Sequence, residues 1–192
     1  VKFGAPEDIL WEQKPHIGTD ILIDVVEAMR KKIEETGGEF RFHSQVTDII
    51  PEEKTLVING GEKIRTDAAV LAIGHSARDT FRMLCDRGFD MEAKAFAVGV
   101  RIEHPQRLID ENMYGKSERG KLPAASYKLT EKLDNGRGVY TFCMCPGGYV
   151  VNASSEQGHL AVNGMSYHGR AGENANSAVI VTVTPDDYGT GH

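Results

Sequence analysis

The stretch AAVLAIGHSARDTF, Ala68–Phe81, decides how the first half of the chain is expected to fold. Its opening run is continuously apolar, as is typical of a strand buried on both faces of a parallel sheet. The run leaves through Gly74, His75 and Ser76, and ligands of open α/β sheets bind beyond such strand ends. This exit can present backbone N–H groups and a hydroxyl to an anion. It can equally be a plain glycine turn with Ser76 as a helix cap, and the local pattern leaves both interpretations open.

The segments upstream complete an α/β pattern. Residues 21–38 carry apolar side chains at helical spacing and end in a glycine pair, with Thr19 or Asp20 as the expected N-cap. The next two stretches, up to residue 60, alternate like strands. We therefore expect a helix that leads into strands, and a partly parallel sheet. Its last strand lies within residues 62–74, turns from alternating to continuously apolar over 68–73, and is followed by a short helix.

The character of the sequence changes after residue 92. Strand-like runs separated by Gly, Asn and Pro recur at short spacing, and only the segment 105–136 is expected to hold a short helix or an ordered excursion. The sequence thus predicts a mixed α+β and α/β protein with two domains. Residues 1–91 carry the α/β pattern, and residues 92–192 are rich in β-strands.

Composition limits the classes of function. The chain has 192 residues and a net charge of −6, and it has no basic stripe, so no nucleic-acid partner is expected. No apolar run approaches the length of a bilayer span, and the first residues do not resemble a signal peptide. We expect a cytoplasmic protein without a membrane partner. The chain starts without Met, and both ends resemble the interior of a longer polypeptide.

The cysteines are candidates for redox or metal chemistry. Cys85, Cys143 and Cys145 are expected to be free thiols, because an odd number with a CxC pair does not resemble a disulfide framework. Alternation along a strand puts Cys143 and Cys145 on the same face, as a redox or metal pair requires. No second Cys pair or Cys/His pair stands at zinc spacing, so no metal site is predicted.

Other polar residues have two interpretations. The long Gly-rich stretch 163–178 carries Arg170, Asn174 and Asn176 between two strands. These side chains can reach a ligand, or the stretch can be a mobile connector. Arg101 alternates with apolar neighbours and is expected on the exposed face of a strand.

Five stretches together resemble a known group of flavoproteins, namely KPHIGTD (14–20), VLAIGHSARDTF (70–81), FAVGVRIEHP (96–105), YTFCMCPGGYVVNASSE (140–156) and NGMSYHGRAGENANSA (163–178). The chain resembles the uncharacterised bacterial FAD-dependent dehydrogenases, or NAD(FAD)-utilising dehydrogenases. Their architecture is similar to that of the glutathione-reductase-type superfamily. The resemblance covers essentially the whole chain.

The resemblance implies roles for particular residues. Val46 would lie beside the adenine end of FAD. The chain would return to the cofactor at a second motif, where glycine allows a close backbone approach; its residues here are Ala72, Gly74, His75 and Ser76. The segment CMCPGG would face the isoalloxazine ring, so the candidates for proton or electron transfer are Cys143, Cys145 and His75.

The resemblance also implies a division of labour. Residues 1–91 would be part of a Rossmann-like FAD-binding domain, and residues 92–192 an inserted substrate or cap domain. The chain lacks the GxGxxG turn that holds the FAD pyrophosphate. By itself it is therefore expected to bind no FAD, to be inactive, and to cover exposed sheet edges by forming a homo-oligomer.

The leading hypothesis is a piece of a FAD-dependent oxidoreductase that acts on an unknown small-molecule substrate, with NAD(P)H as a candidate electron donor. The alternative is a non-catalytic β-rich binding or interaction module. A flavoprotein that modifies RNA is disfavoured by the missing basic surface.

Overall fold

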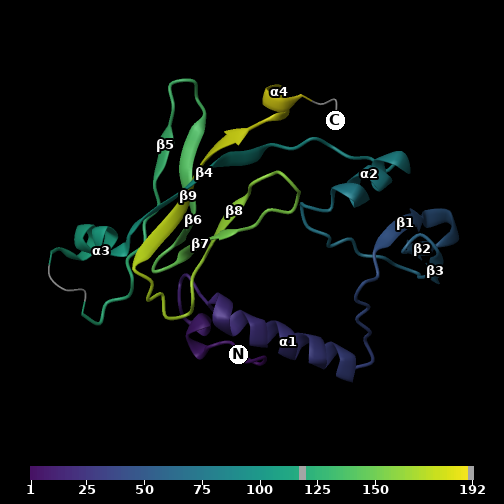
Figure 1. Ribbon diagram of the computed structural model, residues 1–192, viewed down its shortest axis with the longest axis horizontal. Coiled ribbons are helices and arrows are strands. Elements are labelled where there is room, and N and C mark those ends of the chain that lie inside the picture. Colours follow the sequence, from purple (N-terminus) through teal and green to yellow (C-terminus); the bar gives the residue numbers. More distant parts are fainter. Residues whose placement is uncertain (117–119, 190–192) are drawn as a thin grey trace. The chain divides into compact units, whose positions relative to one another are not determined.

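The computed structural model describes residues 1–116 and 120–189, and the chain divides into two compact units (Figure 1). Unit 1 joins Val1–Gly37 to Lys94–His192, and unit 2 is Gly38–Ala93. Both mix helices and strands, and every strand pairing in the described residues is antiparallel. The first helix thus groups with the β-rich half of the chain, while the domain boundary near residue 91 stays a prediction.

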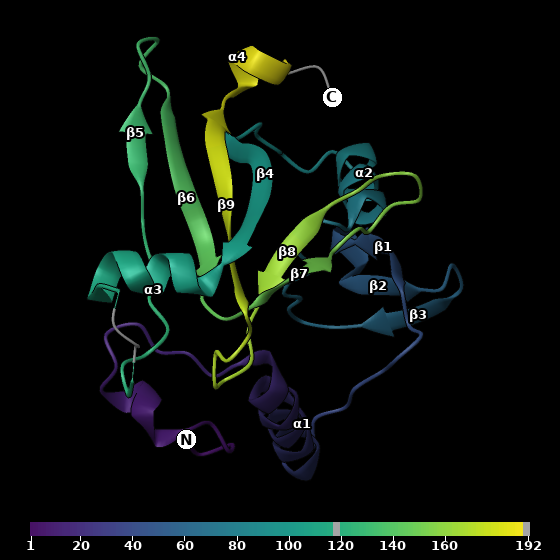
Figure 2. The ribbon, with the colours of Figure 1, turned by 60° about the vertical axis from the view of Figure 1, so that its left-hand side comes forward.

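Unit 1 is built on a four-stranded sheet in the order β4-β9-β6-β5 (Figures 1 and 2). The strands are β4 (Phe96–Pro105), β5 (Thr130–Lys132), β6 (Gly138–Cys145) and β9 (Asn174–Val183). β4 and β9 pair along their whole length. β7 (Tyr149–Asn152) and β8 (Val162–Met165) form a separate hairpin. The β-rich character predicted for this half is confirmed in the described residues.

The helices of unit 1 are α1 (Thr19–Glu35), α3 (Gln106–Tyr114) and α4 (Pro185–Tyr188), with a 3-10 turn η1 (Glu7–Leu10). α1 confirms the predicted helix, but its N-cap is Gly18 and no side chain caps it. The Thr19 hydroxyl donates to the Ser166 carbonyl at 3.0 Å, and the Asp20 carboxylate accepts the His168 N–H at 2.9 Å. The prediction of Thr19 or Asp20 as cap is wrong because both side chains attach the helix to the segment after β8.

α4 is held to the sheet by a charged anchor. The Arg137 guanidinium donates to both carboxylate oxygens of Asp187, at 2.8 and 2.6 Å, and to the Thr182 carbonyl at 2.8 Å. Asp187 also accepts the Thr184 N–H at 2.8 Å, which completes a capping box. The Arg137 guanidinium and the Thr184 N–H together hold the pKa of the Asp187 carboxyl well below its usual range.

Asp187 is expected to make unit 1 acid-sensitive. Because its folded pKa lies below the unfolded value of about 3.9, its contribution to stability is complete above that pH and is lost as the pH falls further toward the folded pKa. Asp187→Asn should lower the melting temperature at pH 6 and flatten its fall between pH 4 and pH 2.5. Asp186→Asn, in the same helical turn, is the matched control. If the melting temperatures of wild type and Asp187→Asn fall in parallel as the pH is lowered, Asp187 is not the source of the acid sensitivity.

Unit 2 is an antiparallel meander with one helix. Its elements are β1 (Val46–Ile50), a 3-10 turn η2 (Pro51–Glu53), β2 (Thr55–Ile58), β3 (Glu62–Arg65) and α2 (Arg78–Asp86). Asn59 and Gly60, with φ of 51° and 74°, join β2 to β3, as the Asn-Gly pair favours in hairpins. α2 packs on β1 with Leu84 buried, which confirms the predicted short helix.

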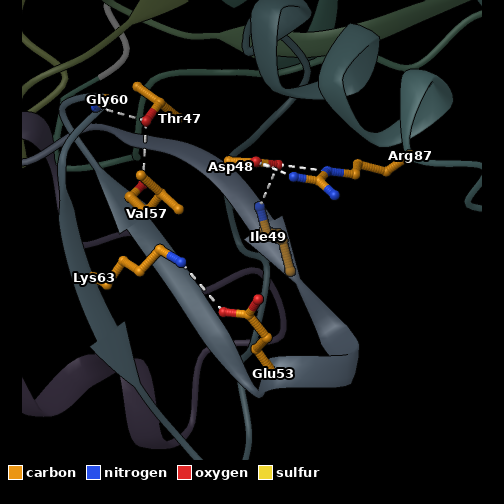
Figure 3. Close-up of polar contacts among 8 residues, drawn as sticks. All are labelled: Thr47, Asp48, Ile49, Glu53, Val57, Gly60, Lys63 and Arg87. Atoms are coloured by element: carbon orange, nitrogen blue, oxygen red, sulfur yellow. Dashed lines mark hydrogen bonds and ion pairs between the residues drawn. The ribbon is translucent and has the colours of Figure 1, made fainter.

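Polar contacts tie α2 and the turns to the meander (Figure 3). The Arg87 guanidinium donates to the Asp48 carboxylate, with Nε at 2.7 Å from Oδ1, and lowers the pKa of that carboxyl. The Thr47 hydroxyl bridges strands by accepting the Gly60 N–H at 2.8 Å and donating to the Val57 carbonyl at 3.2 Å. These contacts fix the β1–β2 register beside α2.

The buried strand predicted over 68–73 is not formed. β3 ends at Arg65, residues 66–77 are irregular, and the Val70 side chain is 90% exposed. No described strand pairs with this segment, so the apolar run has no sheet to enter. The predicted partly parallel sheet is wrong for the same reason, because an apolar composition gives a buried strand only where neighbours pair with it.

None of the helices in the described ranges combines the length and the apolar character that a bilayer crossing requires.

Candidate functional site

The CMCPGG segment, residues 143–148, begins in a bulge at the end of β6. β6 pairs with β9 from Val139 to Phe142, and the ladder resumes with Cys145 opposite Asn176. One extra residue on β6 thus fits between the two pairings. Cys143 occupies this bulge with a left-handed backbone, φ 46°, and an exposed side chain. Cys145 is half-buried and donates its thiol proton to the Cys143 carbonyl at 3.4 Å. The bulge breaks the alternation that predicts both thiols on one face.

An Arg–Asn pair supports the bulge from the neighbouring strands. Arg101 Nη1, from β4, donates to the Cys143 carbonyl at 3.1 Å and to Asn176 Oδ1, from β9, at 2.6 Å. Asn176 is 0% exposed. A Cβ on Gly164, from β8, would lie 2.3 Å from both Arg101 Nη1 and Asn176 Oδ1, and 2.9 Å from Cys145 Sγ. Only glycine at this position lets β8 approach the cluster.

The rest of the segment is buried and held by its backbone. Gln106, 5% exposed at the start of α3, accepts the Gly147 N–H at 2.8 Å. The Gly147 carbonyl in turn accepts the Gly172 N–H at 3.0 Å, and the Gly148 N–H donates to the Asn174 carbonyl at 2.8 Å. Because these bonds come from α3, β9 and the loop before β9, the segment is fixed on several sides and the two thiols have defined positions.

Burial raises the pKa of the Cys145 thiol, and the positive charge of Arg101 opposes part of that rise. Since a free cysteine titrates at about 8.5, Cys145 carries its proton at neutral pH. It is therefore a proton donor in this state rather than a ready nucleophile.

The residues predicted to bind FAD lie in unit 2. Val46 begins β1 and lines a cavity of about 490 Å³ together with Leu71 and Ile73. Ala72 belongs to the same irregular segment. The structure thus brings Val46 close to the apolar run, although that run is not a strand.

The exit after the apolar run is an exposed turn. Gly74 has φ 70°, a conformation that favours glycine. A His75 ring nitrogen lies 3.3 Å from the Ser76 hydroxyl, and both side chains are exposed. Ser76 makes no capping bond to α2, whose N-cap is Ala77. His75 belongs to unit 2 and the two cysteines to unit 1, so no one unit holds all three predicted catalytic residues.

Sequence reasoning missed Arg101, Gln106 and Gly164. Arg101 is not on an exposed strand face, since its side chain bonds to the buried Asn176. Asn176, which the sequence analysis placed in a stretch that could be a mobile connector, is a buried residue of β9. A glycine inside the strand-like VNGM run, residues 162–165, was the available signal, because glycine within a strand often marks a close approach of another chain segment.

No cluster of three or more metal-ligating side chains occurs within residues 1–116 and 120–189.

The fold and this site define unit 1 as a β-rich domain with a hydrogen-bonded, thiol-bearing glycine loop. Residues 95–192 match the family model of the FAD-dependent protein, C-terminal domain-like. The match covers just over half of the 192 residues, and the chain belongs to this family. The resemblance to flavoproteins is confirmed at this level.

A curated relative extends the comparison to the rest of the chain. An uncharacterized protein of Clostridium beijerinckii is 53% identical over 195 residues, which cover 98% of this chain and 36% of the relative. The chain therefore spans about a third of the length of that relative.

Proposed function

We propose that this chain is part of a FAD-dependent oxidoreductase of the NAD(FAD)-utilising dehydrogenase type, with the glutathione-reductase-like architecture that its sequence resembles. The observation that carries the proposal is the match of residues 95–192 to a FAD-dependent family, because that range contains the thiol-bearing loop. Its substrate would be a small molecule, with NAD(P)H as the candidate electron donor. The proposal also includes a location in the cytoplasm and assembly into a homo-oligomer.

Unsatisfied donors around the loop suit an oxygen-rich group such as the flavin of FAD. Among the buried side-chain atoms without a hydrogen-bond partner in the described residues are three donors on residues around this loop: Arg101 Nε, Arg170 Nε and Asn176 Nδ2. Buried donors cost free energy unless an acceptor reaches them. Arg101 and Arg170, whose side chains are partly exposed, are therefore the residues of unit 1 that would hold FAD or a substrate beside it, and the buried Asn176 would position Arg101. When bound, FAD supplies the ring that exchanges hydride.

Within this proposal the chain's own residues have separate roles. Arg101 orients the loop through the Cys143 carbonyl. Cys145 holds a proton at Sγ at neutral pH, because burial raises its pKa. Cys143 offers an exposed thiol at the loop surface. His75 stays a candidate for proton transfer from unit 2.

Residues 1–91 would form part of the FAD-binding domain. Val46, Ala72, Gly74, His75 and Ser76 would then line the cofactor, and the exposed apolar run over 68–73 would enter a sheet supplied by the longer protein. The 90% exposure of Val70 supports this proposal, because an apolar strand left in water is unfavourable. Without a GxGxxG turn, the 192-residue chain alone should hold no FAD and show no activity.

An absorbance spectrum tests the proposal directly. A purified version of this protein, extended to the length of the C. beijerinckii relative, should be yellow, and its flavin absorbance bands should bleach with dithionite. The 192-residue chain alone should be colourless. Bleaching by NADH or NADPH would identify the donor. If the long protein is colourless and takes up no added FAD, the flavoprotein proposal fails and the non-catalytic β-rich binding module becomes the better function.

A further inference from the structure

A cavity of unit 1 opens beside Cys143. Its volume is about 390 Å³, and its walls include Lys14, Tyr127, Lys128, Cys143 and Arg170. This volume lies near the lower end of the range of small-molecule sites. The walls come from the segment before α1, the segment before β5, the bulge of β6 and the loop before β9, so the folded unit is needed to assemble them.

The charge of this cavity is positive on a negative protein. Three of its described lining residues are cations and none is acidic, although the whole chain carries −6. Within the described part of the chain, Lys14, Lys128 and Arg170 form no ion pair with a carboxylate. Cations gathered around a concave surface attract anions and raise their local concentration.

Arg170 is the best-placed of the three cations. Its backbone is left-handed, φ 47°, and its N–H donates to the Tyr167 carbonyl at 3.1 Å. Its carbonyl lies against Gly147, where a Cβ would come within 1.9 Å. Its Nε is buried and has no partner in the described ranges. The Arg170 backbone is thus fixed by a hydrogen bond, and its Nε donor has no acceptor among the described residues.

We propose that this cavity binds a small organic anion, through a carboxylate or phosphate group, next to the Cys143 thiol. Resting on the proposed function, the anion is the substrate of the oxidoreductase, and Lys14, Lys128 and Arg170 select it by charge. Anion binding itself needs no FAD and is a property of unit 1.

Alkylation of Cys143 measures this selection. Iodoacetate and iodoacetamide react in the same way: the thiolate sulfur forms a bond to the CH₂ carbon, the C–I bond breaks, and iodide leaves. Only iodoacetate is an anion. In this chain at low salt, the iodoacetate-to-iodoacetamide rate ratio at Cys143 should exceed that at Cys85 of unit 2 by about tenfold, measured by peptide mass spectrometry. The excess should fall in 0.5 M NaCl, where charges are screened.

Variants assign the effect to the cations. Arg170→Gln and the double variant Lys14→Gln/Lys128→Gln should each lower the ratio at Cys143, while Lys132→Gln on β5 should not. Succinate and inorganic phosphate are the competing probes against neutral iodoacetamide. Slower alkylation with succinate assigns a carboxylate ligand, and slower alkylation with phosphate assigns a phosphate ligand.

Equal ratios at Cys143 and Cys85, or protection by neither competitor, would overturn the anion site. Because the wild-type salt series requires no variant, a variant that fails to fold leaves the test intact. The flavoprotein proposal is judged separately by the spectrum of the long protein. If the long protein is colourless but Cys143 still reacts preferentially with iodoacetate, the FAD proposal is contradicted and the anion site is supported.

Discussion

Replacing Gly147 by alanine is expected to lower the free energy of unfolding of unit 1 by about 3 kcal/mol or more. Gly147 has φ +51°, and a Cβ there would lie 1.9 Å from the Arg170 carbonyl oxygen and 2.3 Å from its carbon. The backbone around Arg170 is held in place, because the Arg170 N–H donates to the Tyr167 carbonyl and the Gly172 N–H donates to the Gly147 carbonyl. The added methyl group therefore cannot be accommodated by a side-chain rotation, and the CMCPGG segment must separate from the loop before β9.

Gly136→Ala is the matched control. Gly136 also has a left-handed backbone, φ +81°, but nothing lies within 4 Å of its Cβ position. Its cost should be only the backbone term, about 1 kcal/mol. Urea denaturation followed by circular dichroism compares the two variants. Equal costs would show that backbone conformation alone, and not the contact with Arg170, explains glycine at position 147.

Arg101→Met is expected to destabilise unit 1 by about 2–3 kcal/mol. The change removes the donor to Asn176 Oδ1 at 2.6 Å and to the Cys143 carbonyl at 3.1 Å. Asn176 is fully buried, so water cannot replace the lost bond, and methionine fills most of the volume without donating. The urea midpoint should fall, with an unchanged dependence on denaturant concentration.

The same substitution should also change the pKa and the alkylation rate of the Cys145 thiol. The charge of Arg101 holds the Cys145 pKa below the value that burial alone would give. Arg101→Met should therefore raise that pKa further and slow alkylation of Cys145 at pH 8. Arg101→Lys separates the two effects, because lysine keeps the charge but lacks the rigid guanidinium that holds Nη1 between the Cys143 carbonyl and Asn176 Oδ1. Loss of stability with an unchanged Cys145 rate is expected for lysine. An unchanged Cys145 rate in Arg101→Met would contradict the electrostatic coupling.

Local patterns predicted several elements correctly. The helical spacing of apolar residues predicted α1 and α2, and alternation with turn residues predicted the β-rich second half. These features depend on residues that are near one another in sequence, so propensity and periodicity describe them well.

The absence of a strand over residues 68–73 could not be predicted from those residues alone. The composition of Ala68–Ile73 favours a buried strand, but strand formation depends on hydrogen-bonding partners from elsewhere. No described strand of this chain supplies them. The caps expected at Thr19 and Asp20 failed for a related reason, because both side chains bond to residues about 150 positions away.

The sequence by itself determined the helices α1 and α2, the β-rich character of the second half, the free cysteines as candidates and the resemblance to FAD-dependent proteins. The tertiary structure alone decided the site: the bulge that separates the environments of Cys143 and Cys145, the Arg101–Asn176 support, the close approach at Gly164 and the cation-lined cavity. The physical reason is distance along the chain. Periodicity and turn chemistry act within a few residues, whereas burial, charge and hydrogen bonding at the site join strands that only the folded chain brings together.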